Sequence, residues 1–387
     1  MGEWRECKLG DLIQSISETY KFTDKKVIFL NTSDIYLGNI INKNEFNPSA
    51  LPGQAKKKIQ TNDLLFSEIR PANGRYALVK DKVDNYVVST KLMVLRSMGD
   101  ILPEYLNIFL TSKDMLDYLQ MLAEDRSGTF PQITFNHISS IDISLPPLTE
   151  QKAIAEVLSC LDDKIDLLHR QNKTLEEMAQ TLFRQWFIEE AKDEWEEVTI
   201  GDFVKTNVST IRKDSSLKTI QYLDTSSLTE GKIDSFQQLD LKEAPSRAKR
   251  MVKHNDILIS TVRPNQKHYG IIKNPTEDII VSTGYCVVSC EKINPHFIYI
   301  LLTTDDMTEY LHSIAEGSTS TYPSLKPSDI EAVEFLLPPE EKLQKFSDYA
   351  DNAWEKIDKN HIQIKTLENM RDTLLPKLMS GEVRVKI

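Results

Sequence analysis

Residues 148–190 read LTEQKAIAEVLSCLDDKIDLLHRQNKTLEEMAQTLFRQWFIEE and contain neither glycine nor proline. Within them, side chains suited to a helix interface recur at alternating intervals of four and three residues. The members of this stripe are Ile154, Leu158, Leu161, Ile165, Leu168, Asn172, Leu175, Ala179, Leu182 and Trp186. A mean spacing of 3.5 residues is typical of a helix that packs against a second helix in a coiled coil. About 40 residues at a rise of about 1.5 Å predict a rod of roughly 60 Å.

A second stripe with the same period lies nearly 200 residues further on. Its members are Phe346, Ala350, Ala353, Ile357, Asn360, Ile364, Leu367, Arg371, Leu374 and Leu378. We expect this helix to be the partner of the first. Pro376 near its end predicts a bent or frayed last turn, because proline removes a helical hydrogen bond.

The two stripes belong to a repeat that covers the chain from Trp4 to about Met379. Short motifs return 192 or 193 positions later. The pairs are Leu30-Asn31-Thr32-Ser33 with Leu223-Asp224-Thr225-Ser226, Arg70-Pro71 with Arg263-Pro264, Val88-Ser89-Thr90 with Val281-Ser282-Thr283, and Lys173-Thr174-Leu175-Glu176 with Lys365-Thr366-Leu367-Glu368. The repeat predicts two similar domains related by a pseudo-two-fold axis. Such a body suits a two-fold symmetric partner, of which duplex DNA is the commonest; duplication without symmetric function is the alternative.

A pseudo-two-fold axis across the helices would make them antiparallel. We expect Asn172 to face Asn360, because a buried amide elsewhere in the stripe would lack a partner. The alternative is that one of the two asparagines faces solvent. This register pairs Ile165 with Leu367, Leu168 with Ile364, Leu175 with Ile357, Ala179 with Ala353, and Trp186 with Phe346, and it brings Leu161 near Arg371. The second helix should then end near Trp4, which makes the architecture pseudo-cyclic.

The residues before each helix have a different texture, with short apolar runs separated by turn signals. In the first copy, strands are predicted at 27–30, 64–66, 76–79, 86–88 and 92–95, and one helix at 103–122. We therefore predict an α+β fold in which two mixed α/β globular domains in tandem repeat are joined by two long antiparallel coiled-coil helices. The expected boundaries are 1–147, 148–190, 191–338 and 339–387.

Composition and motifs narrow the function. The net charge of −11 argues against a generally basic nucleic-acid binder, so any DNA surface must be local. No phosphate-binding GxxxxGK[ST] loop, GxGxxG loop or amino-methyltransferase motif of the Asn/Asp-Pro-Pro-Tyr/Phe kind occurs. The four cysteines form no CxxC pair and have no ligand cluster around them, so we expect reduced thiols and no metal. No apolar run is long enough to cross a membrane, and a cytoplasmic binding protein without a catalytic site or cofactor is the simplest interpretation.

The order of parts resembles the specificity (S) subunit of type I restriction–modification systems. The resemblance rests on Leu145-Pro146-Pro147-Leu148-Thr149-Glu150-Gln151-Lys152, on the helix end Thr181-Leu182-Phe183-Arg184-Gln185-Trp186-Phe187, and on the second domain and helix that follow. The second copy departs from the pattern, because Glu340-Glu341-Lys342-Leu343-Gln344 has no Glu-Gln pair.

The resemblance implies two target-recognition domains, each reading one half of a bipartite DNA target. It also implies that the helices set the spacing of the half-sites and dock two methyltransferase (modification) subunits, through which motor/nuclease (restriction) subunits join. The alternatives are a protein scaffold and a DNA-modifying enzyme with an unrecognised site.

The repeat also suggests which residues contact DNA. Residues identical in both copies should be structural or hold phosphate, whereas residues that differ are freer to read bases. Arg70 and Arg263 are the phosphate candidates, with a structural ion pair as the alternative. Pairs that differ are Asn73/Gln266, Arg75/His268, Lys91/Gly284 and Gln132/Ser324. Three further residues are candidates for DNA contact: Lys267, which follows Gln266, and Thr129 and Tyr322, which lie in matching loops.

Two basic clusters at matching positions complete the candidate surface. They are Lys56-Lys57-Lys58 in the first copy and Arg247, Lys249, Arg250 and Lys253 in the second. A solvated lysine run explains each cluster equally well when it is taken alone.

Overall fold

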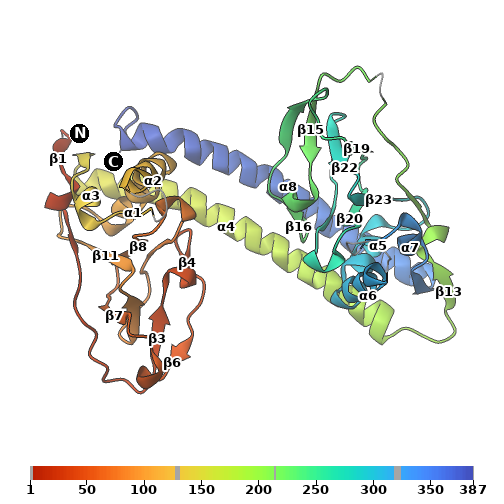
Figure 1. Ribbon diagram of the computed structural model, residues 1–387, viewed down its shortest axis with the longest axis horizontal. Helices are drawn as coiled ribbons and strands as arrows, with labels where there is room; N and C mark the ends of the chain where they lie inside the picture. Colours follow the sequence, from red (N-terminus) through yellow and green to blue (C-terminus); the bar gives the residue numbers. More distant parts are fainter. Residues whose placement is uncertain (1–2, 127–130, 213–214, 318–323, 387) are drawn as a thin grey trace. The chain divides into compact units, whose positions relative to one another are not determined.

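The computed structural model describes residues 3–126, 131–212, 215–317 and 324–386 (Figure 1). The chain forms two compact units. Unit 1 combines Met1–Asp166 with Lys365–Ile387, and unit 2 is Leu167–Ile364. Each unit contains one globular domain and a part of each long helix, α4 (Leu148–Arg184) and α8 (Glu340–Met379).

The two globular domains contain the same elements in the same order. In unit 1 they are β1 (Arg5–Lys8), β2 (Ile13–Ser15), β3 (Val27–Leu30), β4 (Ile35–Tyr36), β5 (Asn39–Ile40), β6 (Glu45–Phe46), β7 (Ala55–Lys58), β8 (Leu64–Ser67), β9 (Tyr76–Leu78), β10 (Tyr86–Ser89), β11 (Leu92–Ser97), α1 (Pro103–Thr111), α2 (Lys113–Arg126), α3 (Phe135–Ser139) and β12 (Asp142–Leu145). In unit 2 they are β13 (Glu196–Thr199), β14 (Val204–Thr206), β15 (Thr219–Leu223), β16 (Leu228–Thr229), β17 (Lys232–Ile233), β18 (Gln237–Asp240), β19 (Ala248–Met251), β20 (Ile257–Ser260), β21 (Tyr269–Ile271), β22 (Ile279–Ser282), β23 (Tyr285–Cys290), α5 (Pro295–Thr303), α6 (Asp305–Glu316), α7 (Pro327–Glu331) and β24 (Glu334–Leu337).

The sheet topology repeats as well. Each domain has one four-stranded sheet with a parallel central pair, ordered β6-β3-β10-β7 or β18-β15-β22-β19. A second sheet is antiparallel throughout and ordered β2-β11-β8-β9 or β14-β23-β20-β21. Even the register irregularity between β7 and β10 recurs between β19 and β22. The predicted strands of the first domain and the tandem α+β repeat are therefore confirmed.

Strand alternation fills two apolar layers in each domain. In β8, Leu65 points into the layer between the two sheets, while Leu64 and Phe66 point toward α1 and the long helices. α1 contributes Tyr105, Leu106 and Leu110 to that outer layer. The antiparallel sheet is thus held between the helices and the other sheet.

The single helix predicted at 103–122 is wrong in one respect. The structure has α1 and α2 with a break at Ser112, whose φ and ψ are −60° and 146°. The same break occurs at Thr304, which caps α6 through Oγ1 and the amide of Met307. A helical period continues across the break, so apolar spacing alone does not reveal it. The break turns α2 and α6 onto the turns that follow Arg70 and Arg263.

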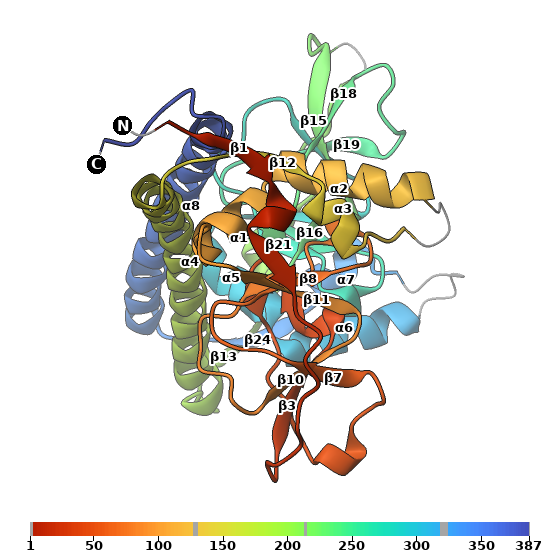
Figure 2. The ribbon, with the colours of Figure 1, turned by 90° about the vertical axis from the view of Figure 1, so that its left-hand side faces the viewer.

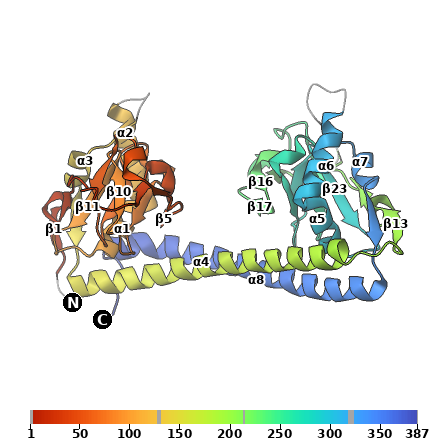
Figure 3. The ribbon, with the colours of Figure 1, turned by 90° about the horizontal axis from the view of Figure 1, so that it is seen from below.

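Within each unit the helix segments run antiparallel. In unit 1, Ile154 and Leu158 of α4 pack with Leu378 of α8, and Arg371 reaches outwards to Asp162 at 3.0 Å. The end of α8 lies beside β1, and the two chain ends lie close together in all three ribbon views (Figures 1, 2 and 3). The expected approach of the second helix end to Trp4 is confirmed. α8 continues through Pro376 to Met379.

In unit 2, Asn172 and Asn360 lie in one layer of the helix pair. Asn360 Nδ2 donates to Asn172 Oδ1 at 2.7 Å and to Gln171 Oε1 at 3.0 Å, and both asparagines are at least 95% buried. Asn172 Nδ2 and Asn360 Oδ1 have no partner within the described part of the chain. That this pair fixes the register stays a prediction.

The predicted pairing of Trp186 with Phe346 is wrong. The rings against Phe346 belong to Phe183 and Phe187, at centroid distances of 5.8 and 5.2 Å. A straight helix has 3.6 residues per turn, so its buried stripe drifts away from a strict 3.5 repeat and advances by one position over a helix of this length. Gln185–Glu189 also form a π-helical turn, which widens the helix at its end.

Candidate nucleic-acid interface

The Arg-Pro pairs that recur in both copies lie on strained turns. Arg70 has φ 45° and ψ 75°, and Arg263 has φ 48° and ψ 66°. Left-handed backbone is uncommon for any residue other than glycine, and a residue before proline is further disfavoured in helical regions. Such strain costs on the order of 1–3 kcal/mol and persists where the surroundings impose it. The same strain in both repeats, with an exposed arginine each time, marks these turns as candidates for function.

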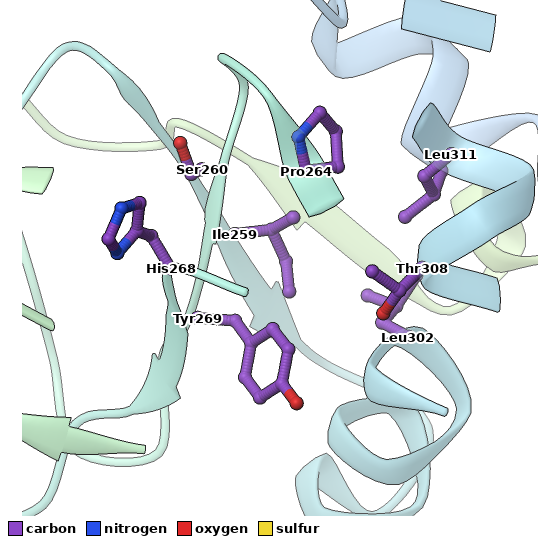
Figure 4. A pocket seen from close by; sticks show the side chains of 8 residues that line it. All are labelled: Ile259, Ser260, Pro264, His268, Tyr269, Leu302, Thr308 and Leu311. Carbon is purple, nitrogen blue, oxygen red and sulfur yellow. The ribbon is translucent and has the colours of Figure 1, made fainter. Parts of the chain in front are cut away.

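Each following proline anchors its turn. Pro71 and Pro264 are buried, and α2 and α6 pack on the two turns. In unit 2 a small, mostly apolar pocket lies beneath the turn, lined by Ile259, Ser260, Pro264, His268, Tyr269, Leu302, Thr308 and Leu311. Figure 4 shows Pro264 toward Leu311 and Thr308 of α6, whereas the His268 ring points away from them. Packing of the proline explains why the arginine before it projects from a rigid base.

Backbone hydrogen bonds gather several of the predicted residues around Arg70. The Glu68 amide donates to Lys91 O at 3.3 Å, the Arg70 amide donates to Pro131 O at 3.2 Å, and the Asn73 amide donates to Arg70 O at 2.9 Å. Gln132 forms a β-bridge with Ile69. We call this group the β8 edge; its members are Glu68, Arg70, Asn73, Lys91 and Gln132.

The second domain has the matching arrangement. The Thr261 amide donates to Gly284 O at 2.8 Å, the Gln266 amide donates to Arg263 O at 2.9 Å, and Ser324 forms a β-bridge with Val262. We call this group the β20 edge; its members are Thr261, Arg263, Gln266, Gly284 and Ser324. Thr129 and Tyr322, also predicted from the sequence, lie outside the described residues.

Glu68 was missed by the reasoning from sequence. It is half-buried, and burial raises its pKa while the neighbouring Lys57 partly offsets that effect. Its counterpart is Thr261, so the comparison of copies that selected Gln132 and Ser324 would have selected this pair too. A carboxylate can accept a hydrogen bond from the amino group of cytosine, which threonine cannot do in the same way.

Arg75 and His268 differ in type but make the same contact. Arg75 Nη1 donates to Ile35 O at 3.1 Å, and its guanidinium lies 5.1 Å from the ring centroid of Tyr36. His268 Nδ1 lies 2.7 Å from Leu228 O, the counterpart of Ile35 O. Each side chain therefore ties β9 or β21 to the neighbouring hairpin, a structural role that the sequence comparison did not reveal.

The basic clusters lie on edge strands. Lys56 and Lys58 of β7 are exposed, whereas Lys57 is half-buried and its Nζ donates to Leu92 O at 2.7 Å. Burial lowers the pKa of Lys57. Lysine on an edge strand also prevents pairing with strands of other molecules. The solvated-run interpretation therefore keeps a physical basis for Lys56 and Lys58.

In unit 2 the basic residues of the cluster, and Lys267 beside them, differ in whether they pair with acidic residues. Arg247 pairs with Asp224 at 3.0 Å, and Lys267 pairs with Asp305 at 2.7 Å and Glu230 at 3.5 Å. Lys249 is exposed. Arg250 is half-buried, its pKa is lowered by burial, and its Nε lacks a partner among the described residues. Lys249, which is exposed, is thus better placed than Arg247, Arg250 or Lys267 to meet an anion.

Nothing in the described ranges has the form of a metal centre or a membrane helix. No group of three or more His, Cys, Asp or Glu residues there is arranged to hold a metal ion. Among the helices of the described chain, none combines the length and apolar character needed to span a bilayer.

Comparison with known proteins gives one consistent family. The type I restriction modification DNA specificity domain matches the chain twice, at residues 1–177 and 192–369. The HindI specificity subunit of Haemophilus influenzae is 30% identical and covers 99% of this chain and 100% of that protein. The MjaIX specificity subunit of Methanocaldococcus jannaschii is 30% identical over 74% of this chain and 70% of that protein.

One solved structure is informative about the fold. The S subunit of a type I restriction–modification system from M. genitalium has a TM-score of 0.61 to this chain. It covers 97% of this chain and 96% of that chain at 16% identity. At that identity the likeness concerns the fold alone.

Proposed function

Because the chain belongs to the family of type I restriction–modification specificity subunits, we propose that its β8 edge and β20 edge each read one half of a bipartite DNA target. The chain is a non-catalytic specificity subunit with two tandem recognition domains. The observation that carries the assignment to the edges is the strained, exposed arginine that recurs at the same place in both repeats.

Within each edge we assign two kinds of contact. Arg70 and Arg263 hold phosphates, because an invariant cation on a rigid turn fixes position without selecting sequence. Lys56 and Lys249, which are exposed, add phosphate contacts beside them. Lys58 lies 3.6 Å from Glu18 and Arg250 is half-buried, so these two contribute less. Base selection falls to the residues that differ between copies, which are Glu68, Asn73, Lys91 and Gln132 in unit 1 and Thr261, Gln266 and Ser324 in unit 2. Arg75 uses one guanidinium nitrogen for its contact with Ile35, and its other nitrogens can contribute to DNA binding. A smaller contribution is expected from side chains whose polar groups already have protein partners, which are Lys57, Arg247, Lys267 and His268.

We divide the chain accordingly into recognition domains at 1–147 and 191–338 and helical elements at 148–190 and 339–387. The helical elements set the spacing between half-sites and dock two methyltransferase subunits, through which motor/nuclease subunits join. The repeat of Lys173–Glu176 as Lys365–Glu368 on the two helices supports two copies of one partner. A subunit that reads chromosomal DNA would act in the cytoplasm.

The test uses the chain assembled with its modification subunits. Mapping of methylated positions in the host genome first gives the target sequence. Glu68→Thr then places the second copy's residue in the first domain, and methylation is mapped again. We expect the base preference of one half-site to be altered or relaxed and that of the other half-site to stay unchanged. Lys113→Thr, at an exposed position at the start of α2, serves as a control for a change of charge outside the β8 edge.

The outcomes separate the alternatives. Unchanged preference with Glu68→Thr removes this residue from the reading set. Equal loss at both half-sites would assign it to folding rather than to reading. Methyl transfer by the purified chain alone would instead support the enzyme alternative, and sequence-independent assembly without DNA binding would support a scaffold.

A further inference from the structure

The start of each long helix makes a three-residue contact with the chain that enters or leaves the domain. In unit 1, Glu150 on the first turn of α4 is only 2% exposed. Both nitrogens Nε and Nη2 of Arg384 donate to its carboxylate, and Trp4 Nε1 donates to Oε2 at 3.2 Å. The Arg384 guanidinium also lies 5.6 Å from the ring centroid of Trp4. A buried carboxylate is thus matched by one cation and one indole.

The counterpart in unit 2 is also an ion pair beside a tryptophan, but its charges are exchanged and its two charged side chains are partly exposed. Lys342 on the first turn of α8 stands where α4 has Glu150. Its Nζ lies 3.0 Å from Glu190 Oε2 and 5.5 Å from the ring centroid of Trp195, which is 8% exposed. In unit 1 the helix supplies the acid and the incoming segment the base, whereas in unit 2 the helix supplies the base and the segment the acid.

The two segments reach these positions by different local structures. After α4, the π-helical turn Gln185–Glu189 ends with the Glu190 amide donating to Gln185 O at 2.9 Å. After α8, Gly381 has φ +76°, and a Cβ at this position would touch the Trp4 ring at 3.4 Å. Two unlike chain ends therefore both bring a charged side chain to the first turn of a long helix, where it meets the opposite charge beside a tryptophan.

Both carboxylates are held in their charged form. Hydrogen bonding from Arg384 lowers the pKa of Glu150, and hydrogen bonding from Lys342 lowers that of Glu190. Exchange of partners between the junctions would place Glu150 against Glu190, or Lys342 against Arg384. Like charges at such a contact are a common means of rejecting a wrong partner.

We propose that the two junctions are charge-swapped clamps, so that residues 380–386 dock on the helix start of the first repeat and are rejected by that of the second. A duplicated chain offers two similar docking positions, and a tail that takes the wrong one joins molecules by exchange of segments. The opposite polarity selects the closure of unit 1 by the tail of the same chain. This inference is independent of which residues read DNA.

The test measures hydrogen exchange of tail peptides in the full chain by mass spectrometry. Arg384→Glu should raise the exchange rate of amides 380–386 at least about tenfold, because an unpaired buried Glu150 then faces a like charge. Glu150→Lys with Arg384→Glu gives unit 1 the polarity that unit 2 already has, and it should restore protection to within about threefold. Lys152 is an exposed neighbour of Glu150. Lys152→Glu makes the same change of charge as Arg384→Glu and should leave the exchange rate of the tail unchanged.

A second variant tests selection between the repeats. Glu150→Lys with Lys342→Glu moves the acidic helix start to the second repeat, where it attracts Arg384 and repels Glu190. We expect greater concentration-dependent self-association by light scattering than for the unsubstituted chain, and loss of it when Arg384→Gln is added. Full tail protection in Arg384→Glu, no recovery in the double swap, or unchanged association in this variant would each overturn the proposal.

Discussion

Arg70 adopts a backbone conformation that glycine would adopt without strain, and it does so at the turn that we assign to phosphate binding. Arg70→Gly should therefore raise the free energy of unfolding by about 1 kcal/mol, since relief of strain outweighs the added freedom of the unfolded chain. The same substitution should weaken DNA binding on every sequence, because a phosphate contact is lost. Urea denaturation and binding of the assembled complex to duplex DNA measure the two effects.

Arg70→Ala separates these contributions. Alanine removes the guanidinium but keeps the strain, so it should weaken DNA binding as glycine does without the gain in stability. Equal stability of the two variants would mean that the turn is not strained. Normal DNA binding by both would exclude Arg70 from the interface.

At the level of elements, the buried amide pair Asn172–Asn360 should lower stability relative to an apolar pair while it selects one register of the helices. Substitution of the two residues tests this. Asn360→Leu leaves Asn172 Oδ1 without its donor and should lower the free energy of unfolding by about 1–3 kcal/mol. The double variant Asn172→Leu with Asn360→Leu removes both polar groups and should recover most of this loss. Urea denaturation of the two single variants and the double variant forms a complete cycle.

The cycle has a clear contrary outcome. Strictly additive effects would show that the two amides are not coupled, and the hydrogen bond between them would then have no part in stability. If the double variant also shows several sets of exchange rates in the helices, the loss of a unique register accounts for them.

His296 links α5 to α8 and predicts acid sensitivity of unit 2. Its Nδ1 lies 2.9 Å from Asp351 Oδ1, its Nε2 lies 2.7 Å from Lys273 Nζ, and its ring stacks on Trp354. Burial lowers the pKa of His296 to about 4, with a further contribution from the charge of Lys273 and a smaller one from His254. Asp351 opposes this shift. The unfolded chain binds this proton near pH 6.5, and the folded chain does not until about pH 4.

Stability should therefore fall as pH decreases from 6.5 to 4, by up to about 3 kcal/mol, and this contribution should level off below that range. His296→Phe keeps a ring on Trp354 and removes the titration, so its free energy of unfolding should depend less on pH across this window. Substitution of the exposed His169 by Gln should retain the dependence. A parallel pH dependence in His296→Phe and the unsubstituted chain would contradict the assignment.

Elements with long, regular patterns were predictable from the sequence. The heptad stripe located both helices, and the repeat predicted that Asn172 and Asn360 could meet. The break at Ser112 was not predictable, because the apolar period runs through it. Phe183 and Phe187, and not Trp186, pack on Phe346, because the buried face of the helix drifts along its length. A fixed period of 3.5 residues does not represent this drift.

For the whole molecule, the presence of one edge in each unit predicts independent contributions to DNA affinity. Arg70→Ala and Arg263→Ala should each reduce the dependence of log affinity on log salt by about 1, and the double variant by about 2. Losses of binding free energy should add, because Arg70 and Arg263 lie in different compact units and each rests on its own turn and helix. Titrations of the assembled complex at several salt concentrations measure this, with Lys152→Ala as a control.

The candidate site was predictable only in part. Comparison of copies found Arg70, Arg263, Gln132 and Ser324, which backbone hydrogen bonds do bring together. It could not tell that Arg75 and His268, although different, make one shared contact with a carbonyl group. A difference in residue type shows freedom to vary, whereas the role of a side chain depends on which neighbours the fold supplies.

The division of the chain into units has a consequence for biosynthesis. Unit 2 is one continuous segment, but unit 1 needs residues from both sides of it in the sequence. During synthesis, Ile154 and Leu158 are made long before Leu378, which covers them in the folded protein. Domains generally fold as they leave the ribosome, so the first recognition domain waits with an uncovered apolar helix face until the segment around Leu378 emerges. Termination of synthesis between Ile364 and Leu378 would therefore damage the domain made first and spare the one made second.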